Sequence, residues 1–307
     1  MNLEELVILM KAKSYLLEMG AGKLAKNYRT TRENIYKAKD IVRQGKIATK
    51  RTPKILILDI ETAPIKAWVW GRWKQNISPD AVISDWFMLG YSCKWFNDSE
   101  IHSDVLTGNE VLVENDSRIV RGIWKFLNQA DFVVCHNGNM FDIPRIKSRF
   151  IIHGLPPTTF YQQIDTLKIA RKEFGFSSNK LDVLAKLFGF DGKFGTTMEL
   201  WVECMNGNEE SLQYMRHYNE QDVVVLENIY RKMIPFIKSH PNHNLYTESK
   251  TPICPSCGGE HLIKDGEYYT QSGRYNTFRC LDCGGISRER KTTLAKDKKL
   301  LLSIPGR

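Results

Sequence analysis

Two acidic residues follow a run of aliphatic residues in the stretch ILILDIETAP, which covers Ile55 to Pro64. Side chains two positions apart on a β-strand point to the same side, so Asp59 and Glu61 would present two carboxylates together. Two like charges at the end of a buried strand repel each other unless a cation lies between them. Carboxylate oxygens suit Mg²⁺ or Mn²⁺, although a capping acid beside a solvent-facing acid would leave the same pattern.

Two further acids could complete such a metal site. Asp142 lies in DFVVCHNGNMFDIPRI, which predicts a buried strand, a turn and a helix start, where an acid also favours the helix dipole. Tyr218 and Asp222 stand four residues apart in HYNEQD on the last long predicted helix, so the phenol and the carboxylate share one face. Asp222 opens the apolar run VVVL, which indicates a carboxylate facing inward, where it needs a cation.

A second metal site is predicted near the C-terminus, where two Cys-x₂-Cys pairs are separated by 22 residues. Four thiolates match a tetrahedral Zn²⁺, and the glycines after each pair permit tight turns. A closed site of this kind folds its module and performs no reaction. The predicted ligands are Cys254, Cys257, Cys280 and Cys283. This cysteine usage fits a reducing compartment better than a disulfide framework.

The elements that must position these residues predict an α/β fold. Strand-like runs begin at Ile55, a helix follows around DSRIVRGIWKFLNQA, another strand follows in DFVVCHN, and the chain is then mostly helical to about residue 238. This order describes a mixed sheet covered by helices. We expect four parts: a helical domain over residues 1–50, an α/β domain over 54–240, a Cys₄ zinc ribbon over 250–291 and a basic tail over 292–307.

The helical domain has features of a helix-turn-helix unit, with Thr31 as the N-cap of its second helix. Small and apolar residues fall at suitable positions, namely Leu24, Ala25, Tyr28, Ile35 and Ala38. Arg29 stands where the turn usually holds glycine, so a plain basic helical hairpin is the alternative. The basic stretch GKIATKRTPK that follows predicts a linker.

Charge is concentrated in the flanks. Residues 1–53 carry a net charge of +7 and residues 246–307 carry +4, whereas residues 54–245 carry −2. Basic flanks suit a polyanionic partner because each neutralised phosphate releases counterions, although basic faces also serve solubility. No apolar run approaches the roughly 20 residues that span a bilayer. The N-terminus also lacks the pattern of a signal peptide, so we expect a cytoplasmic protein, in the host cytoplasm if it is viral.

Three motifs together resemble those of a known family, the 3′-to-5′ exonucleases with a ribonuclease H-like fold. The stretches DIE, HNGNMFD and YNEQD look like the three motifs of the subgroup named for four acids and a tyrosine (DEDDy), which includes the proofreading domains of family B DNA polymerases. The segment IDTLKIARKEFGFSSNKLDVLAKLFGF also resembles the region between the second and third motifs. The resemblance covers about residues 54–235. The cysteine segment resembles the zinc ribbons of transposases and other DNA-associated proteins.

This resemblance implies two-metal hydrolysis of phosphodiester bonds in single-stranded DNA or frayed ends. It implies that Asp59 bridges two Mg²⁺ or Mn²⁺ ions, that Glu61 and Asp222 complete the first, and that Asp142 holds the second largely through water. It also implies that Tyr218 orients the attacking water. DNA is the expected partner, with replication or repair proteins as further partners.

Several neighbouring residues have two interpretations. Thr62 and Asn137 adjoin the motifs and could touch the terminal nucleotide. Asp165 matches an acid common in such nucleases, but a strand-edge or helix-capping role explains it as well. His136 and His217 have the character of packed or surface histidines, and the Tyr-x-x-x-Asp spacing favours Tyr218 over His217 as the catalytic residue.

Other functions stay open at this stage. An exoribonuclease would use the same chemistry, because contacts to the 2′-hydroxyl cannot be read from these residues. A DNA-binding regulator could use the nuclease fold as a scaffold, although all four acids and the tyrosine are present. Aromatic residues in the ribbon could stack on bases or serve its packing, and these are Tyr268, Tyr269, Tyr275 and Phe278.

Overall fold

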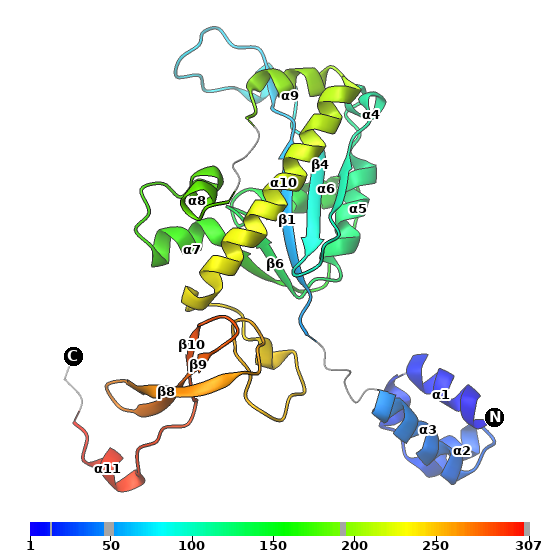
Figure 1. The fold of residues 1–307 in the computed structure, drawn as a ribbon. Coiled ribbons are helices and arrows are strands. Elements are labelled where there is room, and N and C mark those ends of the chain that lie inside the picture. Colours follow the sequence, from blue (N-terminus) through cyan, green and yellow to red (C-terminus); the bar gives the residue numbers. More distant parts are fainter. Residues whose placement is uncertain (13, 46–51, 191–194, 304–307) are drawn as a thin grey trace. The chain divides into compact units, whose positions relative to one another are not determined.

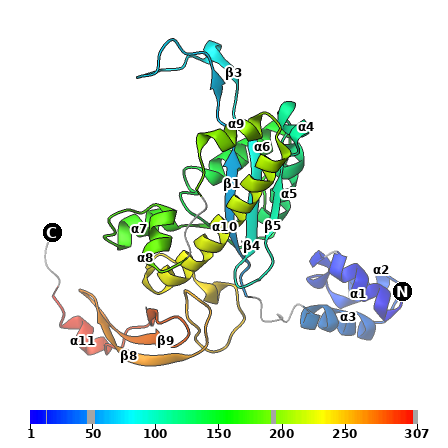
Figure 2. The ribbon, with the colours of Figure 1, turned by 45° about the horizontal axis from the view of Figure 1, so that its top comes forward.

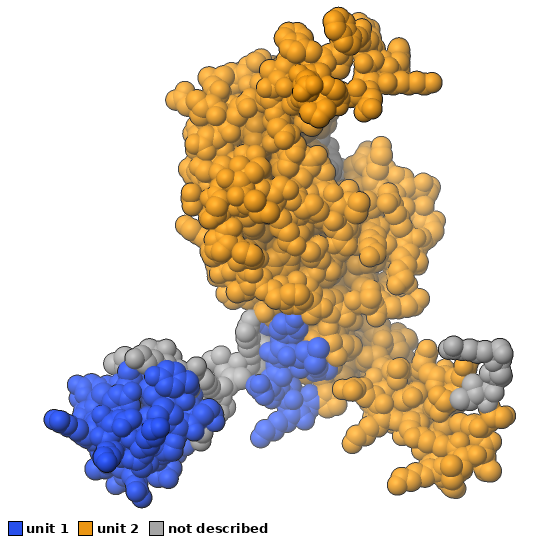
Figure 3. All heavy atoms as spheres, turned by 180° about the vertical axis from the view of Figure 1, so that it is seen from behind, with its two compact units in different colours: residues 1–52, 244–251 blue, residues 53–243, 252–307 orange. Residues whose placement is uncertain are grey.

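The computed structural model describes residues 1–12, 14–45, 52–190 and 195–303, and the chain divides into two compact units (Figure 3). The first unit comprises residues 1–52 and 244–251, and the second comprises residues 53–243 and 252–307. Most of the predicted linker, residues 46–51, lies outside the described residues. None of the helices in the described ranges combines the length and apolar character needed to span a bilayer.

The second unit is built on a mixed five-stranded sheet of order β5-β4-β1-β6-β7. β1 runs antiparallel to β4 and parallel to β6, and it lies at the centre of the sheet. The fold class is therefore the predicted mixed α/β sheet flanked by helices. The strands are β1 (Ile55–Thr62), β4 (Met88–Trp95), β5 (His102–Val105), β6 (Phe132–Cys135) and β7 (Gln162–Asp165).

The strand β7 lies in a region that we expected to be mostly helical. Its four residues contain two glutamines and no aliphatic run, so its strand character has little local cause. It forms because it pairs in parallel with all four residues of β6.

Helices cover both faces of this sheet, as Figures 1 and 2 show. One face, which carries Leu56, Leu58 and Ile60, packs with buried aliphatic residues of α5 and α6. Because side chains alternate along a strand, Ile57, Asp59 and Glu61 point to the opposite face. That face meets α10, which packs against β1 and β4. The helices of this unit are α4 (Gly108–Leu112), α5 (Ser117–Leu127), α6 (Asp142–Ile152), α7 (Thr166–Glu173), α8 (Leu181–Leu187), α9 (Met198–Met205), α10 (Glu209–Met233) and η3 (Ile234–Phe236).

A buried ion pair fixes α10 on β4. Glu227 of α10 pairs with Lys94 of β4, and its carboxylate also accepts a hydrogen bond from the Asn97 amide at 3.1 Å. At its other end α10 is capped by Asn208, whose side chain accepts from the Ser211 amide at 3.1 Å. The contacts of Glu227 set the position of α10 along the sheet, and hence where its inward-facing polar residues lie.

A hairpin interrupts the sheet between β1 and β4. It consists of β2 (Lys66–Ala67), η2 (Pro79–Ala81) and β3 (Val82–Ser84). The two strands pair antiparallel, and the Trp68 amide donates to the Ala81 carbonyl at 2.9 Å. Figure 2 shows this segment extending away from the sheet.

The C-terminal part of the second unit is a three-stranded antiparallel sheet of order β10-β9-β8. Its strands are β8 (Leu262–Tyr269), β9 (Arg274–Cys280) and β10 (Ile286–Arg288). The sequence predicts the first two, joined by a turn at Gly273. The predicted basic tail contains a short helix, α11 (Lys296–Leu300).

The first unit is helical and has a core of its own. Its elements are α1 (Leu3–Ala12), η1 (Ser14–Leu17), α2 (Ala21–Asn27) and α3 (Arg32–Gly45), and η4 (His243–Leu245) begins at the boundary of the two units. Leu24, Ile35 and Ala38 are buried in this core. The Thr31 hydroxyl accepts a hydrogen bond from the Asn34 amide at 3.1 Å, as an N-cap of α3 does. Arg29 adopts the left-handed conformation, with φ at +47°, between α2 and α3. DNA binding by this unit stays a prediction.

Candidate functional site

Three of the predicted acids meet between β1 and α10. Asp59, Glu61 and Asp222 each offer one carboxylate oxygen, and these oxygens all lie within 4.8 Å of one another. Strand alternation puts the first two on the α10 face of β1, and the position of α10 brings the third to them. Oxygens at this spacing, with their mutual repulsion, are the donor set that a hard divalent cation prefers. The arrangement fits Mg²⁺ or Mn²⁺.

Asp142 lies beside this group, at the first position of α6. Its Oδ1 accepts a hydrogen bond from the Ile60 amide at 3.3 Å, between the two acids of β1. The side chain is buried, with an exposed fraction of 1%, and burial raises the pKa of Asp142 to about 7. A charged carboxylate is therefore costly here unless positive charge is near.

Tyr218 is buried on α10, one turn before Asp222. Its neighbour His217 has a largely exposed side chain and hydrogen-bonds Glu220 at 3.2 Å through Nδ1. The burial of the two side chains thus differs as the Tyr-x-x-x-Asp spacing predicts. Tyr218 is directed into the protein, and His217 lies on the surface.

Two residues beside the acids were not singled out from the sequence. Asn219 follows Tyr218, and its Nδ2 donates to Asp59 Oδ2 at 2.6 Å. Arg145, one turn after Asp142, donates to the Thr62 hydroxyl at 3.2 Å. Both residues lie within or next to the motifs, so their closeness to the motif acids in the sequence was the only feature that could have pointed to them. The pairing of each with its partner depends on how distant segments pack.

Thr62 opens onto a pocket of about 500 Å³ directly after the acids of β1. Its carbonyl accepts from Trp201 Nε1 at 3.2 Å, so α9 is held against the end of the strand. The Arg145 guanidinium lies 4.7 Å from the centre of the Trp86 ring. The pocket thus combines a cation, a hydroxyl and two indoles, and its lining includes Thr62, Pro64, Trp86, Arg145 and Trp201.

Asp165 has a structural role that its backbone partners explain. Its carboxylate accepts four backbone N–H groups, from Asn137 at 3.0 Å, Asn139 at 3.1 Å, Leu167 at 3.0 Å and Lys168 at 3.2 Å. One carboxylate thus caps α7 and also holds the turn between β6 and α6. In that turn Asn137 has a φ of +74°, which a non-glycine residue adopts only with support. Of the two interpretations of Asp165, the structure supports capping.

His136 is also held by packing contacts. Its Nδ1 is 2.8 Å from the Thr166 hydroxyl and its Nε2 is 2.9 Å from the Asn179 carbonyl. Both ring nitrogens therefore have partners that belong to other segments of the core. This agrees with the interpretation of His136 as an ordinary packed histidine.

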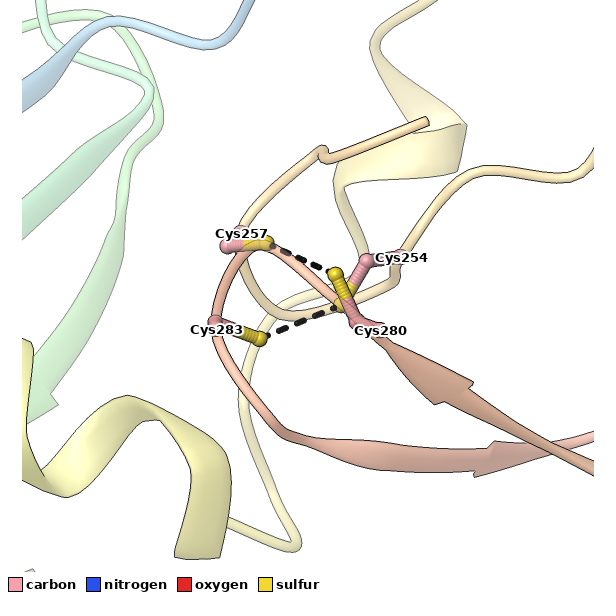
Figure 4. Close-up of side chains that lie close together, drawn as sticks. All are labelled: Cys254, Cys257, Cys280 and Cys283. Carbon is pink, nitrogen blue, oxygen red and sulfur yellow. Dashed lines mark hydrogen bonds between the residues drawn. The ribbon is translucent and has the colours of Figure 1, made fainter. Parts of the chain in front are cut away.

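The four C-terminal cysteines converge in the ribbon (Figure 4). All four sulfurs lie within 4.8 Å of one another, and the cross pairs Cys254–Cys283 and Cys257–Cys280 are each 3.7 Å apart. A tetrahedron with metal–sulfur bonds of about 2.3 Å has edges of about 3.8 Å. The sulfur positions therefore fit one tetrahedral metal ion such as Zn²⁺.

Two features favour thiolates in this cluster. The Gly259 amide donates to Cys257 Sγ at 3.3 Å, and the Gly285 amide donates to Cys283 Sγ at 3.4 Å. The side-chain hydrogen bond between Cys254 and Cys257 lowers the pKa of Cys254 to about 5 and raises the pKa of Cys257. His261 instead bonds Asp282 at 2.7 Å through Nδ1 and does not belong to the cluster.

Exposed aromatic residues lie on the ribbon, as one of the two interpretations requires. Tyr268 and Tyr269 are exposed. The Arg288 guanidinium lies 4.5 Å from the Tyr275 ring centre and 5.6 Å from that of Tyr268, so part of this aromatic surface packs within the ribbon.

A family model matches part of the α/β region of the chain. Residues 95–234 match the family model described as the RNase H superfamily. The five-stranded mixed sheet and its flanking helices are consistent with a ribonuclease H-like fold. The match includes Asp142, Tyr218 and Asp222, whereas Asp59 and Glu61 precede it.

Among solved structures, the chain is similar to the family B DNA polymerase from the hyperthermophilic archaeon Pyrobaculum calidifontis. The identity is 19% with a TM-score of 0.44, over 60% of this chain and 25% of the polymerase chain. The chain thus spans about a quarter of the length of that polymerase. Among curated proteins none matches this chain.

The buried Asp142 predicts a pH dependence of stability in buffer without Mg²⁺ or Mn²⁺. Its pKa is raised from 3.8 to about 7 on folding, so the folded protein holds a proton that the unfolded chain releases between these values. The free energy of unfolding should therefore fall as the pH rises from about 4 to 7, by about 1.4 kcal/mol per unit from this group, and then level off. Urea titrations of wild type and Asp142→Asn should differ by this slope. Parallel curves for the two proteins would contradict the prediction, and added Mn²⁺ should reduce the loss.

Asp165→Ala should destabilise the protein by about 2–4 kcal/mol, because four backbone N–H groups lose their acceptor. Asp165→Asn is the matched control. It keeps the Oδ1 acceptor used by Asn137, Leu167 and Lys168, and loses only the contact to Asn139. Its loss of unfolding free energy in urea should therefore be the smaller of the two. Equal stability of Asp165→Ala and wild type would refute the capping role.

Cys280→Ser should reduce bound zinc from about one ion per chain to nearly none, because a structural site requires all four ligands. The ribbon should then become sensitive to proteases while the α/β core stays resistant. His261→Ala is the control, since His261 lies outside the cluster, and its zinc content should equal that of wild type. Retention of a full zinc equivalent by Cys280→Ser would rule out the predicted ligand set.

Proposed function

We propose that this protein is a metal-dependent 3′-to-5′ exonuclease that hydrolyses phosphodiester bonds of DNA at single-stranded or frayed ends. The observation that carries the proposal is the convergence of Asp59, Glu61 and Asp222 within 4.8 Å on a ribonuclease H-like fold. Acids from two distant segments gathered in this way suit a divalent cation, and such a cation can stabilise the charge that develops on a reacting phosphate. The three motifs of the DEDDy subgroup are all present in the chain.

In this proposal the carboxylates hold the catalytic ions. Asp59, Glu61 and Asp222, with Asp142 beside them, would hold two Mg²⁺ or Mn²⁺ ions. Bound there, the ions supply Lewis acidity that lowers the pKa of an attacking water and neutralises charge on the leaving oxygen.

The remaining residues of the site position these groups. The Asn219 amide, 2.6 Å from Asp59, fixes the orientation of the shared carboxylate. Tyr218 orients the attacking water, since a phenol with a pKa near 10 is a poor base at neutral pH. Thr62 and Asn137 contact the terminal nucleotide, and Arg145 positions Thr62 through their 3.2 Å hydrogen bond.

The other parts of the chain serve substrate binding. We assign residues 250–291 to a Cys₄ zinc ribbon, which the 3.7 Å sulfur pairs support, and residues 1–50 to a helix-turn-helix-like DNA-binding domain. Residues 54–240 form the nuclease domain. The net charge of +7 over residues 1–53 and +4 over residues 246–307 fits contacts to phosphates by the segments that precede and follow this domain in the sequence.

A 5′-labelled single-stranded oligodeoxynucleotide tests the proposal. With Mg²⁺ or Mn²⁺ the wild type should shorten it stepwise from the 3′ end. Asp59→Ala and Asp222→Ala should each lower kcat about 10²- to 10³-fold or more, because each loss removes charge stabilisation at the reacting phosphate. Tyr218→Phe should lose about 10- to 100-fold, since it loses only a positioning group.

His217→Ala serves as the matched control, because His217 lies next to Tyr218 but faces solvent, and its rate should equal that of wild type. Absence of metal-dependent cleavage by the intact protein would remove the nuclease assignment and leave a DNA-binding role. Faster cleavage of a matched oligoribonucleotide would assign RNA as the substrate.

A further inference from the structure

Three tryptophans on one short segment are almost fully exposed. The segment Pro64–Trp86, which we call the aromatic arm, contains β2, η2 and β3. The exposed fractions of Trp68, Trp70 and Trp73 are 77%, 105% and 86%. Further exposed aliphatic residues of the arm are Ile65, Val69, Ile77 and Ile83. Apolar surface of this size gathered on one segment marks a binding surface, because its exposure to water is otherwise unfavourable.

The charge of the arm indicates the kind of partner. Lys66, Arg72 and Lys74 alternate with the tryptophans, and no acidic residue occurs between Pro64 and Pro79. Cations placed among exposed indoles suit a ligand with flat apolar faces joined by negative charges. A second copy of this chain fits poorly, since it carries a net charge of +9.

The aromatic arm follows directly after the strand that carries Asp59 and Glu61. It leaves β1 two residues after Thr62, and Pro64 and Trp86, at its two ends, both line the pocket of about 500 Å³ that contains Thr62 and Arg145. Its base is held by Glu114, which accepts from the Ser84 hydroxyl at 2.6 Å and lies 3.9 Å from Lys66 Nζ. A polymer bound along the arm would therefore lead to the pocket and to the acids.

We infer that the aromatic arm binds single-stranded nucleic acid, stacking unpaired bases on Trp68, Trp70 and Trp73 and contacting phosphates with Arg72 and Lys74. Base pairs in a duplex hide their faces from such stacking, so the surface selects single strands. The inference rests on the proposed function, because it names the form of substrate that the acid site receives. It adds a binding site outside the three motifs.

The test measures binding apart from cleavage. All proteins carry Asp59→Asn, so the probe stays intact, and the probe is a fluorescein-labelled oligothymidylate of about 20 nucleotides followed by anisotropy. The combined variant Trp68→Ala, Trp70→Ala and Trp73→Ala should bind at least about tenfold more weakly, while binding of a blunt duplex should change far less. The same three positions changed to Phe should recover most of the affinity, because rings for stacking remain.

A matched control replaces exposed apolar residues elsewhere. Ile151→Ala with Phe160→Ala removes side chains with exposed fractions of 80% and 87% that lie outside the arm, and it should bind the probe as the parent does. Arg72→Gln with Lys74→Gln should weaken binding and flatten its salt dependence. Circular dichroism melting curves of all variants show whether each is folded.

Unchanged probe binding by the folded alanine variant would overturn the inference. Concentration-dependent self-association of the parent in sedimentation, lost in that variant, would also overturn it and assign the arm to contacts between copies. Cleavage by the chain with native Asp59 is measured separately. If that chain does not cleave DNA but the tryptophans of the arm still govern probe binding, the proposed function is wrong and the binding inference holds. If the chain cleaves DNA but the tryptophan substitutions leave binding unchanged, the proposed function holds and the binding inference is wrong.

Discussion

Repulsion among gathered carboxylates is the constraint on which the rest of this structure depends. Asp59, Glu61 and Asp222 lie within 4.8 Å of one another, and Asp142 adjoins them in a fully buried position. Such a cluster lowers the stability of the metal-free protein, so the surrounding fold must hold it by other interactions. β1 supplies these as the central strand, with neighbours on both sides and helices on both faces. The ion pair of Glu227 with Lys94 fixes α10 opposite it.

The carboxylates of this region differ in the hydrogen-bond donors that they accept from. Asp165 accepts four backbone N–H groups and thereby holds a turn and a helix start. Asp142 accepts from the Ile60 amide at 3.3 Å, and burial raises its pKa to about 7. Asp59 is oriented by the Asn219 amide. Residues of one chemical type are thus separated by their hydrogen-bond partners into a structural acid and acids available to a cation.

The chain has two candidate metal-binding clusters of different chemical type at separate places. Carboxylate oxygens at the sheet suit hard cations that exchange ligands and water, whereas four thiolates in the ribbon suit a closed tetrahedral ion. The α/β core has extensive apolar packing of its own, from Leu56 through Met215. The ribbon has few buried residues, among them Cys254 and Cys280, so a metal bound by its four cysteines would supply much of its stability. Loss of metal therefore has different consequences at the two sites.

Local patterns in the sequence determined the types of element and the identities of the candidate ligands. The aliphatic run before Asp59, the four-residue spacing of Tyr218 and Asp222, and the paired cysteines each follow from periods and spacings of a few residues. The central mixed sheet also followed from the order of strands and helices. The strand β7, by contrast, has no aliphatic run and depends on pairing with β6. Asp165 could be read in two ways because two of its contacts, with Asn137 and Asn139, join it to residues 28 and 26 positions away in the chain.

Only the tertiary structure decided which residues meet. Asn219 contacts Asp59 across 160 positions, and Arg145 contacts Thr62 across 83. Such pairs depend on where α10 and α6 settle on the sheet, which is the sum of many weak packing contacts and leaves no period in the sequence. The same holds for the exposure of Trp68, Trp70 and Trp73, since composition would place tryptophans in a core. Residue types and short spacings therefore specified the chemistry, and long-range packing specified its geometry.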